Sequence, residues 1–280
     1  MVEPGREAEL SSPGPHPGRD AARRRLGGGA VLAVGGVIVL SIGTSLEIRH
    51  VIGLPLLMIL LPALALAQAP LLEGERLERS VVYRGSMAAI LALGVLSLLL
   101  AMPSPGLDAI GIRPLALPAF VAWTTGMTAA GMLLVGLSSR VGSPAAGPRD
   151  RLLLHLLPRT GREKRLFAGL SLSAGVGEEL AFRGYAMAAL QLLFLPPWTA
   201  AVATSAAFGM MHAYQGMAGI LRTALVGVVL AGSVLQTGSL LPAMAAHALV
   251  DLGAGLVLGP RLVSRAREAA ATLDRVREGR

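Results

Sequence analysis

The chain has 280 residues, of which 53% are hydrophobic and 15% charged, and its mean hydropathy is +0.63. A soluble domain carries roughly 25% charged residues, so this composition excludes an ordinary water-soluble globule. Lys and Arg outnumber Asp and Glu by 25 to 17. Membrane topology accounts for such a surplus, and we expect no nucleic-acid partner. The chain has no cysteine, which excludes disulfides, thiolate metal sites and a cysteine nucleophile.

The two ends of the chain differ in composition from the rest. Residues 1–25 are rich in Pro, Gly and charged residues, and we interpret them as a disordered cytoplasmic leader. The apolar run that follows is long enough to remain in a bilayer, so we expect no cleaved signal peptide. Residues 26–260 then form one transmembrane domain, and 261–280 form a basic C-terminal tail.

Long apolar runs indicate how often the chain crosses the membrane. A span needs about 20 apolar residues, and the runs of this kind predict an all-α, polytopic membrane protein with eight transmembrane helices. They cover residues 27–46, 51–72, 85–103, 115–138, 166–190, 196–213, 217–237 and 240–259.

The distribution of basic residues tests this count independently, because the cytoplasmic flanks of membrane proteins are enriched in Lys and Arg. With the amino terminus inside, the inner segments hold 21 of the 25 basic residues, and the outer loops hold only Arg49 and Arg113. This alternation favours eight helices with both termini in the cytoplasm. The inner segment 152–157 is either a basic amphipathic helix on the inner leaflet or a linker.

Few ionisable side chains interrupt the apolar runs. Each costs about 2.5–3.5 kcal/mol at the centre of a membrane helix, so their presence needs a reason. Six of them lie in the second half of the chain: Glu178, Glu179, Arg183, His212, His247 and Asp251; Arg222 also lies within or beside a span there.

The spacing of these residues indicates how they pair. Glu179 and Arg183 are four residues apart on one helix face, where a carboxylate and a guanidinium can pair. Glu178 has no cation at this spacing and is our candidate general base. With a rise of about 1.5 Å per residue, Glu178 and His247 lie at similar depth. His212 lies nearer the cytoplasm by the same count, so a tilted helix or a water-filled vestibule must bring it to the others.

Residues of these types also occur in membrane spans for reasons that involve no catalysis. A lone histidine or a Glu-Arg pair in a span is commonly a packing contact, and a solute pathway with a proton relay also uses such groups. No His-Glu-x-x-His and no Gly-x-Ser-x-Gly motif is present, and the scattered serines make a serine nucleophile the poorer interpretation.

Three short motifs carry a family resemblance: Glu178-Glu179-x-x-x-Arg183, Phe208-x-x-x-His212 and His247-x-x-x-Asp251. Their order and their placement on successive late helices resemble the signature of the CAAX-processing and bacteriocin-processing (CPBP, or Abi) family of intramembrane proteases. The similarity extends over about residues 150–260, the expected protease core. It implies an eight-helix fold with a cavity open to the cytosol and the membrane. It also implies hydrolysis of peptide bonds in membrane-associated substrates; eukaryotic members remove the last three residues of prenylated CAAX proteins.

The resemblance also implies roles for individual residues. Glu178 with His212 would hold and activate the attacking water, and Glu179 with Arg183 would form a supporting pair. His247, with the residue at position 251, would stabilise the oxyanion of the tetrahedral intermediate.

Members of the family differ in the residue at position 251 and in whether they use a metal. Its CAAX endopeptidases place asparagine where this chain has Asp251. Family members are described both as glutamate proteases and as metalloproteases, so Glu178, His212 and His247 are also candidate ligands of a divalent metal such as zinc. We place the metal-free mechanism slightly ahead.

The expected partners are the lipid bilayer and a membrane-associated peptide or protein substrate, and the expected location is the plasma membrane of a bacterium. Two other functions fit the same residues. One is a catalytically silent scaffold or a bacteriocin self-immunity protein of the same fold. The other is a small-solute or proton-coupled carrier, although no inverted repeat is detectable. Gly184, Tyr185, Tyr214 and Gln215 either shape a substrate groove or pack the helices.

Overall fold

The computed structural model describes residues 17–72, 77–102, 104–141, 148–261 and 264, and these residues form helices and no strand. The all-α prediction is therefore confirmed for the described part of the chain. All eight predicted apolar segments are helical.

The first half of the bundle holds the first four of these segments and a short connecting helix. They are α1 (Pro17–Gly43), α2 (Ile48–Pro55) with the π-helical turn η1 (Leu56–Leu60), α3 (Leu61–Gln68) with the 3₁₀ turn η2 (Ala69–Leu71), α4 (Arg79–Ala101), α5 (Leu117–Val141) and the short α6 (Pro148–Leu156).

The second half holds the other four segments and every candidate site residue. They are α7 (Gly161–Glu179) with the π-helical turn η3 (Leu180–Ala186) and α8 (Met187–Gln191), α9 (Pro197–Met211), the 3₁₀ turn η4 (Ala213–Gln215) with α10 (Gly216–Thr237), and α11 (Leu241–Leu252) with the π-helical turn η5 (Gly253–Leu258).

Six helical segments of the described chain are long and apolar enough to cross a membrane, which makes this a multi-pass membrane protein. The other two predicted spans differ from these six. Residues 161–191 carry the two glutamates and the arginine of the first motif, and Pro197–Met211 has only 15 residues. Both still pack inside the bundle, so the count of eight crossings stays a prediction.

Helix α1 begins earlier than the sequence predicts. Residues 17–25, which we expected in the disordered leader, form its first turns. Ala21 and Ala22 favour the helix, and Asp20 in the first turn faces the positive end of the helix dipole. The remaining leader residues, 1–16, and the tail beyond Arg261, except for Ser264, lie outside the described residues.

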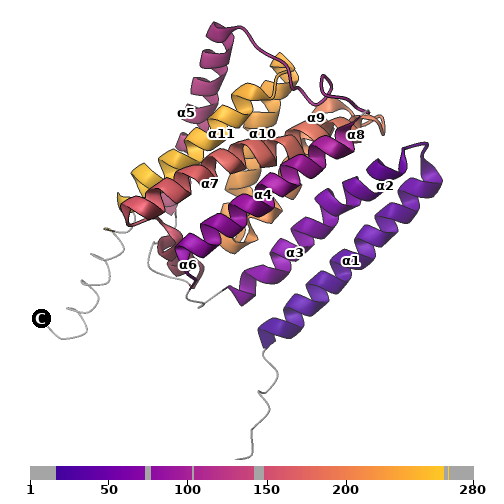
Figure 1. Ribbon diagram of the computed structural model, residues 1–280. Helices are drawn as coiled ribbons and strands as arrows, with labels where there is room; N and C mark the ends of the chain where they lie inside the picture. Colours follow the sequence, from indigo (N-terminus) through magenta and orange to yellow (C-terminus); the bar gives the residue numbers. More distant parts are fainter. Residues whose placement is uncertain (1–16, 73–76, 103, 142–147, 262–263, 265–280) are drawn as a thin grey trace, which may run out of the picture.

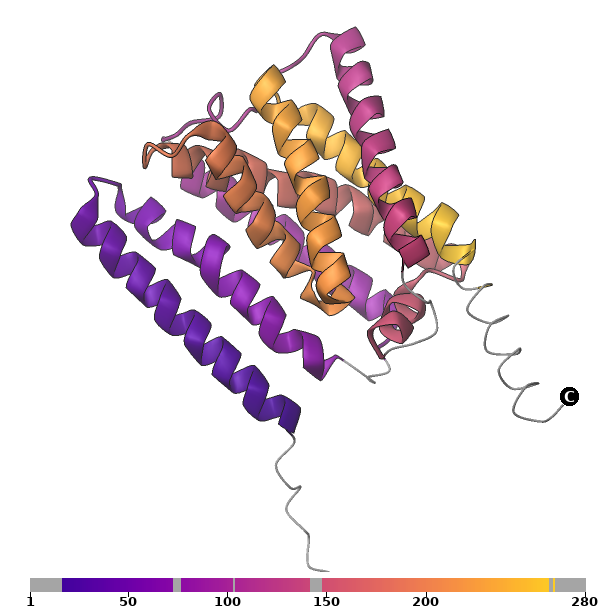
Figure 2. The ribbon, with the colours of Figure 1, turned by 180° about the vertical axis from the view of Figure 1, so that it is seen from behind.

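The helices are arranged as one bundle in which α7 lies between α4 and α11 (Figure 1). Helices α1 and α3 lie side by side at one edge, and α5 packs on α10 and α11 at the other (Figures 1 and 2). The start of α1, α6 and the end of η5 lie at the same end of the bundle. We call this the basic end, because the first turns of α1, which lie there, carry Arg23, Arg24 and Arg25.

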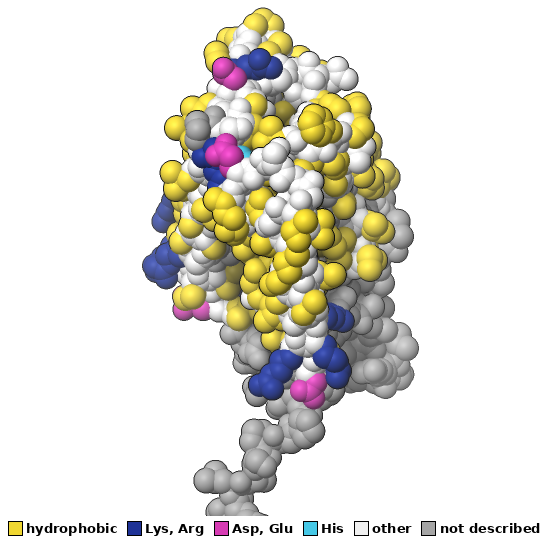
Figure 3. Space-filling model, turned by 90° about the vertical axis from the view of Figure 1, so that its right-hand side faces the viewer, with side chains coloured by type: hydrophobic (Ala, Val, Ile, Leu, Met, Phe, Trp, Pro, Cys, Tyr) yellow, Lys and Arg dark blue, Asp and Glu magenta, His cyan; other side chains and the backbone are white. Residues whose placement is uncertain are grey.

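The bundle surface agrees with a lipid environment. Figure 3 shows the side that carries α1, where hydrophobic side chains cover much of the surface and Lys and Arg lie at the top, at the bottom and along the left edge. Several large apolar side chains of α1 are exposed, including Val31, Val39 and Ile42. Such exposure is favourable in lipid and unfavourable in water.

Polar contacts hold together the helices at the basic end of the bundle. The Arg79 Nε and Tyr83 hydroxyl groups of α4 donate to the backbone oxygens of His155 and Leu156 in α6. Glu163 then forms a capping box with Thr160 at the start of α7, in which each side chain accepts from the other's backbone N–H. Arg79 also pairs with Glu163 at 3.3 Å, which fixes the start of α7 relative to α4.

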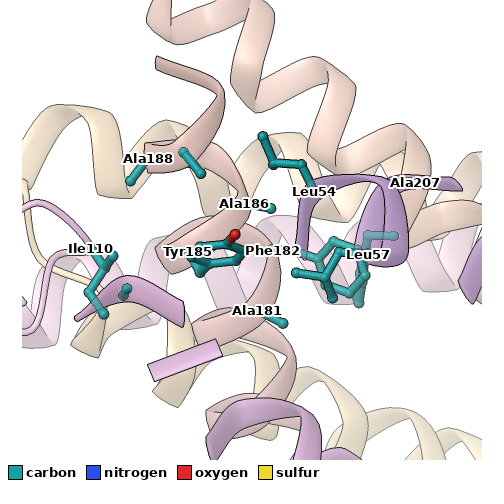
Figure 4. Packing of buried hydrophobic residues seen from close by; sticks show 12 residues of the cluster. Leu54, Leu57, Ile110, Ala181, Phe182, Tyr185, Ala186, Ala188 and Ala207 are labelled. Carbon is teal, nitrogen blue, oxygen red and sulfur yellow. The ribbon is translucent and has the colours of Figure 1, made fainter. Parts of the chain in front are cut away.

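One of two hydrophobic core clusters among the described residues lies between η1, η3 and α9. Phe182 and Tyr185 of η3 pack there against Leu54 and Leu57, with small alanines filling the remaining space (Figure 4). Because η3 directly follows the two glutamates of the first motif, this packing holds the motif in place.

Candidate active site

Two glycines place the first motif between neighbouring helices. A Cβ atom at Gly177 would lie 2.4 Å from the backbone oxygen of Ile90 in α4, and one at Gly175 would lie 2.5 Å from that of Met244 in α11. Real Cβ atoms essentially never come so close, so glycine is needed for α7 to approach both helices. The end of α7 is thereby held against α11, which carries His247.

A buried ion pair comes directly after these two glycines in the sequence. Arg183 Nη1 donates to Glu179 Oε1 at 3.0 Å, and neither side chain is exposed to solvent. The pairing predicted from the i, i+4 spacing is therefore present. His247 Nδ1 lies 2.8 Å from the same carboxylate oxygen. Because an ionised carboxylate only accepts hydrogen bonds, Nδ1 carries a proton and donates it to Glu179.

The Arg183 guanidinium has a prepared space. Its Cζ atom lies 4.2 Å from the centroid of the Phe208 ring, a favourable cation–π distance. A Cβ atom at Gly227 of α10 would lie 2.4 Å from Arg183 Nη2, so this glycine leaves room for the guanidinium. The charge is thus compensated by a carboxylate on one side and an aromatic face on another.

Two carboxylates converge on the other nitrogen of His247. Glu178 Oε2 lies 3.6 Å from His247 Nε2, and Asp251 Oδ2 lies 3.8 Å from it. Both distances are too long for a direct hydrogen bond, and Glu178 Oε2 is buried with no hydrogen-bond partner among the described residues. A water molecule or a substrate oxygen set against Nε2 can satisfy these groups.

His212 occupies the carboxyl end of α9. Its Nδ1 lies 3.0 Å from the backbone oxygen of Phe208, which can only accept, so Nδ1 carries the proton and Nε2 is left as an acceptor. The Phe208 ring contacts both histidines edge-on, with centroids 4.9 Å from His212 and 5.7 Å from His247. The Phe208 ring therefore packs against both histidines.

A cavity of about 330 Å³ joins these groups to the basic end of the bundle. His212, His247 and Asp251 line it, and leucines of the α6 region, among them Leu153 and Leu154, line its side near that end. Asp251 is the most open member, with 41% of its side chain exposed, whereas Glu178 has 16% exposed and is not part of the wall. Glu178 therefore lies behind the wall, 3.6 Å from the Nε2 atom of His247, which does line the cavity.

The predicted metal ligands do not form a ligand cluster in this arrangement. Among the described residues, no group of three or more His, Asp or Glu side chains is placed to hold a metal ion. The Nδ1 atoms of His212 and His247 bond to the backbone oxygen of Phe208 and to Glu179, which leaves the Nε2 atoms of both rings available. A divalent-metal site at Glu178, His212 and His247 therefore stays a prediction.

The residues beside the motifs divide into two kinds. Tyr214 and Gln215 line the cavity, together with Arg222, whose Nη2 donates to Gln215. Tyr185 is buried in the core, where its hydroxyl lies 3.2 Å from His50 Nδ1, and Gly184 packs against Leu240, just before α11, and Ile110, in the loop before α5. Only the first pair can contact a molecule in the cavity.

The roles of Phe208 and Gly227 do not follow from the sequence alone. Phe208 is notable there only as the first residue of its motif, and Gly227 is one of many glycines in apolar helices. Arg222 can be found from the sequence, because a charged residue beside a membrane span needs a partner in or near the bundle.

The fold and the site together define a multi-pass helical membrane protein with a carboxylate- and histidine-containing site inside its bundle. Residues 164–253, which include all six candidate site residues, match the model of a family described as type II CAAX prenyl endopeptidase Rce1-like. This match confirms the resemblance that the three motifs predicted and indicates a hydrolase of the protease kind in a membrane. No curated protein and no solved structure matches the chain.

Proposed function

We propose that this protein is an intramembrane endopeptidase that hydrolyses peptide bonds of membrane-associated substrates with a water molecule as nucleophile. The observation that carries the proposal is the convergence of Glu178 Oε2 and Asp251 Oδ2 on His247 Nε2, beside a cavity inside a membrane bundle. A carrier or a packing cluster does not require an unpartnered carboxylate next to a histidine already oriented by a second carboxylate.

The first step is general-base catalysis. A water molecule bound beside Glu178 transfers one proton to the Glu178 carboxylate as its oxygen attacks the carbonyl carbon of the scissile bond. His212 Nε2, the acceptor left by the hydrogen bond of Nδ1 to Phe208, orients this water by accepting from it. The carbonyl double bond becomes a single bond, and its electron pair moves to the oxygen.

The second step is stabilisation of that oxyanion. With both ring nitrogens protonated, His247 donates through Nδ1 to Glu179 and through Nε2 to the oxyanion. Collapse of the tetrahedral intermediate then breaks the C–N bond. Glu178 returns its proton to the leaving nitrogen, which restores the free carboxylate.

Glu179 and Arg183 act as positioning residues in this scheme, because they touch His247 or each other and not the substrate. Glu179 determines which nitrogen of His247 faces the cavity. Arg183 neutralises Glu179, which is completely buried.

The substrate enters from the basic end, where the cavity is bordered by the α6 region. We propose the cytoplasmic face of a bacterial plasma membrane for this end, since basic residues gather there. A peptide or protein held at the membrane surface would place its scissile bond in the cavity without crossing the bilayer.

The test is cleavage of membrane-inserted peptides by the purified full chain in liposomes. Glu178→Gln and His247→Ala should each abolish cleavage while the protein inserts normally. Asp108→Asn, which changes an exposed carboxylate between α4 and α5, is the matched control and should cleave like wild type. Undiminished cleavage by both site variants would contradict the proposal.

A further inference from the structure

A second cavity lies at the basic end, away from the candidate active site. Its volume is about 450 Å³, and it lies between α1 and α3. Its floor is apolar and is formed by Met58, Ile59, Pro62, Ala63, Leu66 and Met210. None of its lining residues lines the cavity of the active site.

The mouth of this groove is cationic. Arg24 and Arg25 line it, and both are exposed. Arg25 Nη1 donates to the backbone oxygen of Leu66 at 3.0 Å, which holds the guanidinium across the end of the groove. A guanidinium has five N–H donors in a planar fork that matches a phosphate group. The bond to Leu66 uses one of the five donors of Arg25.

Two adjacent glycines of α1 form the groove. A Cβ atom at Gly29 would lie 2.1 Å from that of Ala63, so Gly29 holds α1 close to α3. A Cβ atom at Gly28 would meet nothing within 4 Å, and Gly28 itself lines the cavity. Gly28 thus leaves open a space that any larger side chain would fill.

From these features we infer that the groove binds an anionic phospholipid of the leaflet at the basic end, with its phosphate at Arg24 and Arg25 and one acyl chain along the apolar floor. The charge of the mouth selects the ligand, because basic pockets between membrane helices near the bilayer surface bind anionic headgroups. On the face that carries α1, Lys and Arg side chains lie at the lower end, below a largely hydrophobic surface (Figure 3). A zwitterionic lipid offers the same chain without the net charge.

One lining residue of the groove, Met210, belongs to the second half of the bundle, which holds the candidate active site. Met210 lies two residues before His212, at the end of α9. The lipid therefore packs against the helix that carries a candidate catalytic residue without entering its cavity, and its binding does not depend on proteolytic activity.

The test uses the full chain in liposomes that contain phosphatidylglycerol or phosphatidylcholine with a photoreactive acyl chain, and crosslinked peptides are mapped by mass spectrometry. Phosphatidylglycerol should label peptides that contain Met58, Ile59 or Met210, and phosphatidylcholine should label them much less. Gly28→Leu should remove this labelling, whereas Gly35→Leu, at another open glycine of α1, should leave it unchanged.

The arginines are tested separately by titration with phosphatidylglycerol. Arg24→Gln with Arg25→Gln should weaken binding roughly 10-fold to 30-fold, since each basic residue contributes about a five-fold effect near an anionic surface. Arg23→Gln, which lies outside the groove, is the control. Equal labelling by both lipids, or labelling that survives Gly28→Leu, would overturn the inference. Because lipid labelling is the readout, the result is independent of whether the protein cleaves peptides.

Discussion

Nδ1 of His247 donates to Oε1 of Glu179 at 2.8 Å, although the two residues are 68 positions apart in the chain. This bond crosses from α7 to α11 and directs Nε2 of His247 toward Glu178 and Asp251. The same oxygen of Glu179 accepts from Arg183. The Glu179 carboxylate therefore contacts both the guanidinium of the buried ion pair and the histidine that the proposed mechanism uses.

The Glu179–Arg183 pair should be strongly coupled in stability. Removing one partner of a buried ion pair costs about 3–5 kcal/mol, because the other charge is left uncompensated. We expect Glu179→Gln and Arg183→Met each to lower the free energy of unfolding by about this amount. The double variant should lose clearly less than the sum. Denaturant unfolding in detergent measures the three variants, and strictly additive losses would contradict the coupling.

Asp251 should tolerate asparagine better than alanine. An asparagine at 251 keeps an oxygen near His247 and adds an N–H donor for the oxyanion. We therefore expect Asp251→Asn to retain cleavage. Asp251→Ala removes the oxygen that faces His247 Nε2, the donor to the oxyanion, and should lower kcat by about 10²-fold, as a disturbed oxyanion contact does. Steady-state peptide cleavage compares the two, and equal loss in both would argue that the negative charge itself is required.

Close packing at Gly177 should be intolerant of a methyl group. A Cβ atom there would lie 2.4 Å from a backbone oxygen of α4, which cannot move like a flexible side chain. Gly177→Ala should therefore lower stability by about 1–3 kcal/mol through overpacking. Gly126→Ala, at an open position of α5, should be neutral or slightly stabilising because alanine favours the helix. Thermal unfolding in detergent distinguishes them; equal effects would show that the approach of α7 to α4 is not tight.

Glu163 gives the fold a defined pH dependence at the start of α7. The backbone N–H groups of Thr160 and Arg159, aided by Arg79, lower the pKa of Glu163 from 4.5 to about 2. A depressed carboxyl pKa contributes stability that is complete above the unfolded value and is lost as pH falls toward the folded value. Glu163→Gln keeps the capping oxygen but loses the charge. Its deficit in melting temperature should be largest above about pH 5 and should shrink between about 4.5 and 2; a deficit that does not change with pH would contradict this.

The parts of the fold that follow from local pattern were predictable from the sequence. Each apolar run is helical, and the i, i+4 spacing of Glu179 and Arg183 produced the pair that the structure contains. The leader boundary was wrong for residues 17–25, because hydropathy finds the apolar run and does not detect a polar first turn that is still helical.

Features that depend on tertiary packing could not be predicted in this way. The straight-helix count placed His212 nearer the cytoplasm than His247 and could not show how the two meet. In the structure, α9 ends at Met211, and His212 has non-helical angles of φ −95° and ψ 23° before a 3₁₀ turn. Both histidines line one cavity, with the Phe208 ring against both. The hydrogen bond between His247 and Glu179 also requires the glycine-mediated approach of α7 to α11, which no spacing within one helix encodes.

The most direct test of the proposed mechanism is peptide cleavage by purified wild type and Glu178→Gln in detergent, each with and without a metal chelator, with products identified by mass spectrometry. We predict that wild type cleaves equally in both conditions and that Glu178→Gln cleaves in neither. Cleavage that is lost with the chelator and restored by zinc, or cleavage that persists in Glu178→Gln, would contradict the assignment of Glu178 as the base that activates water.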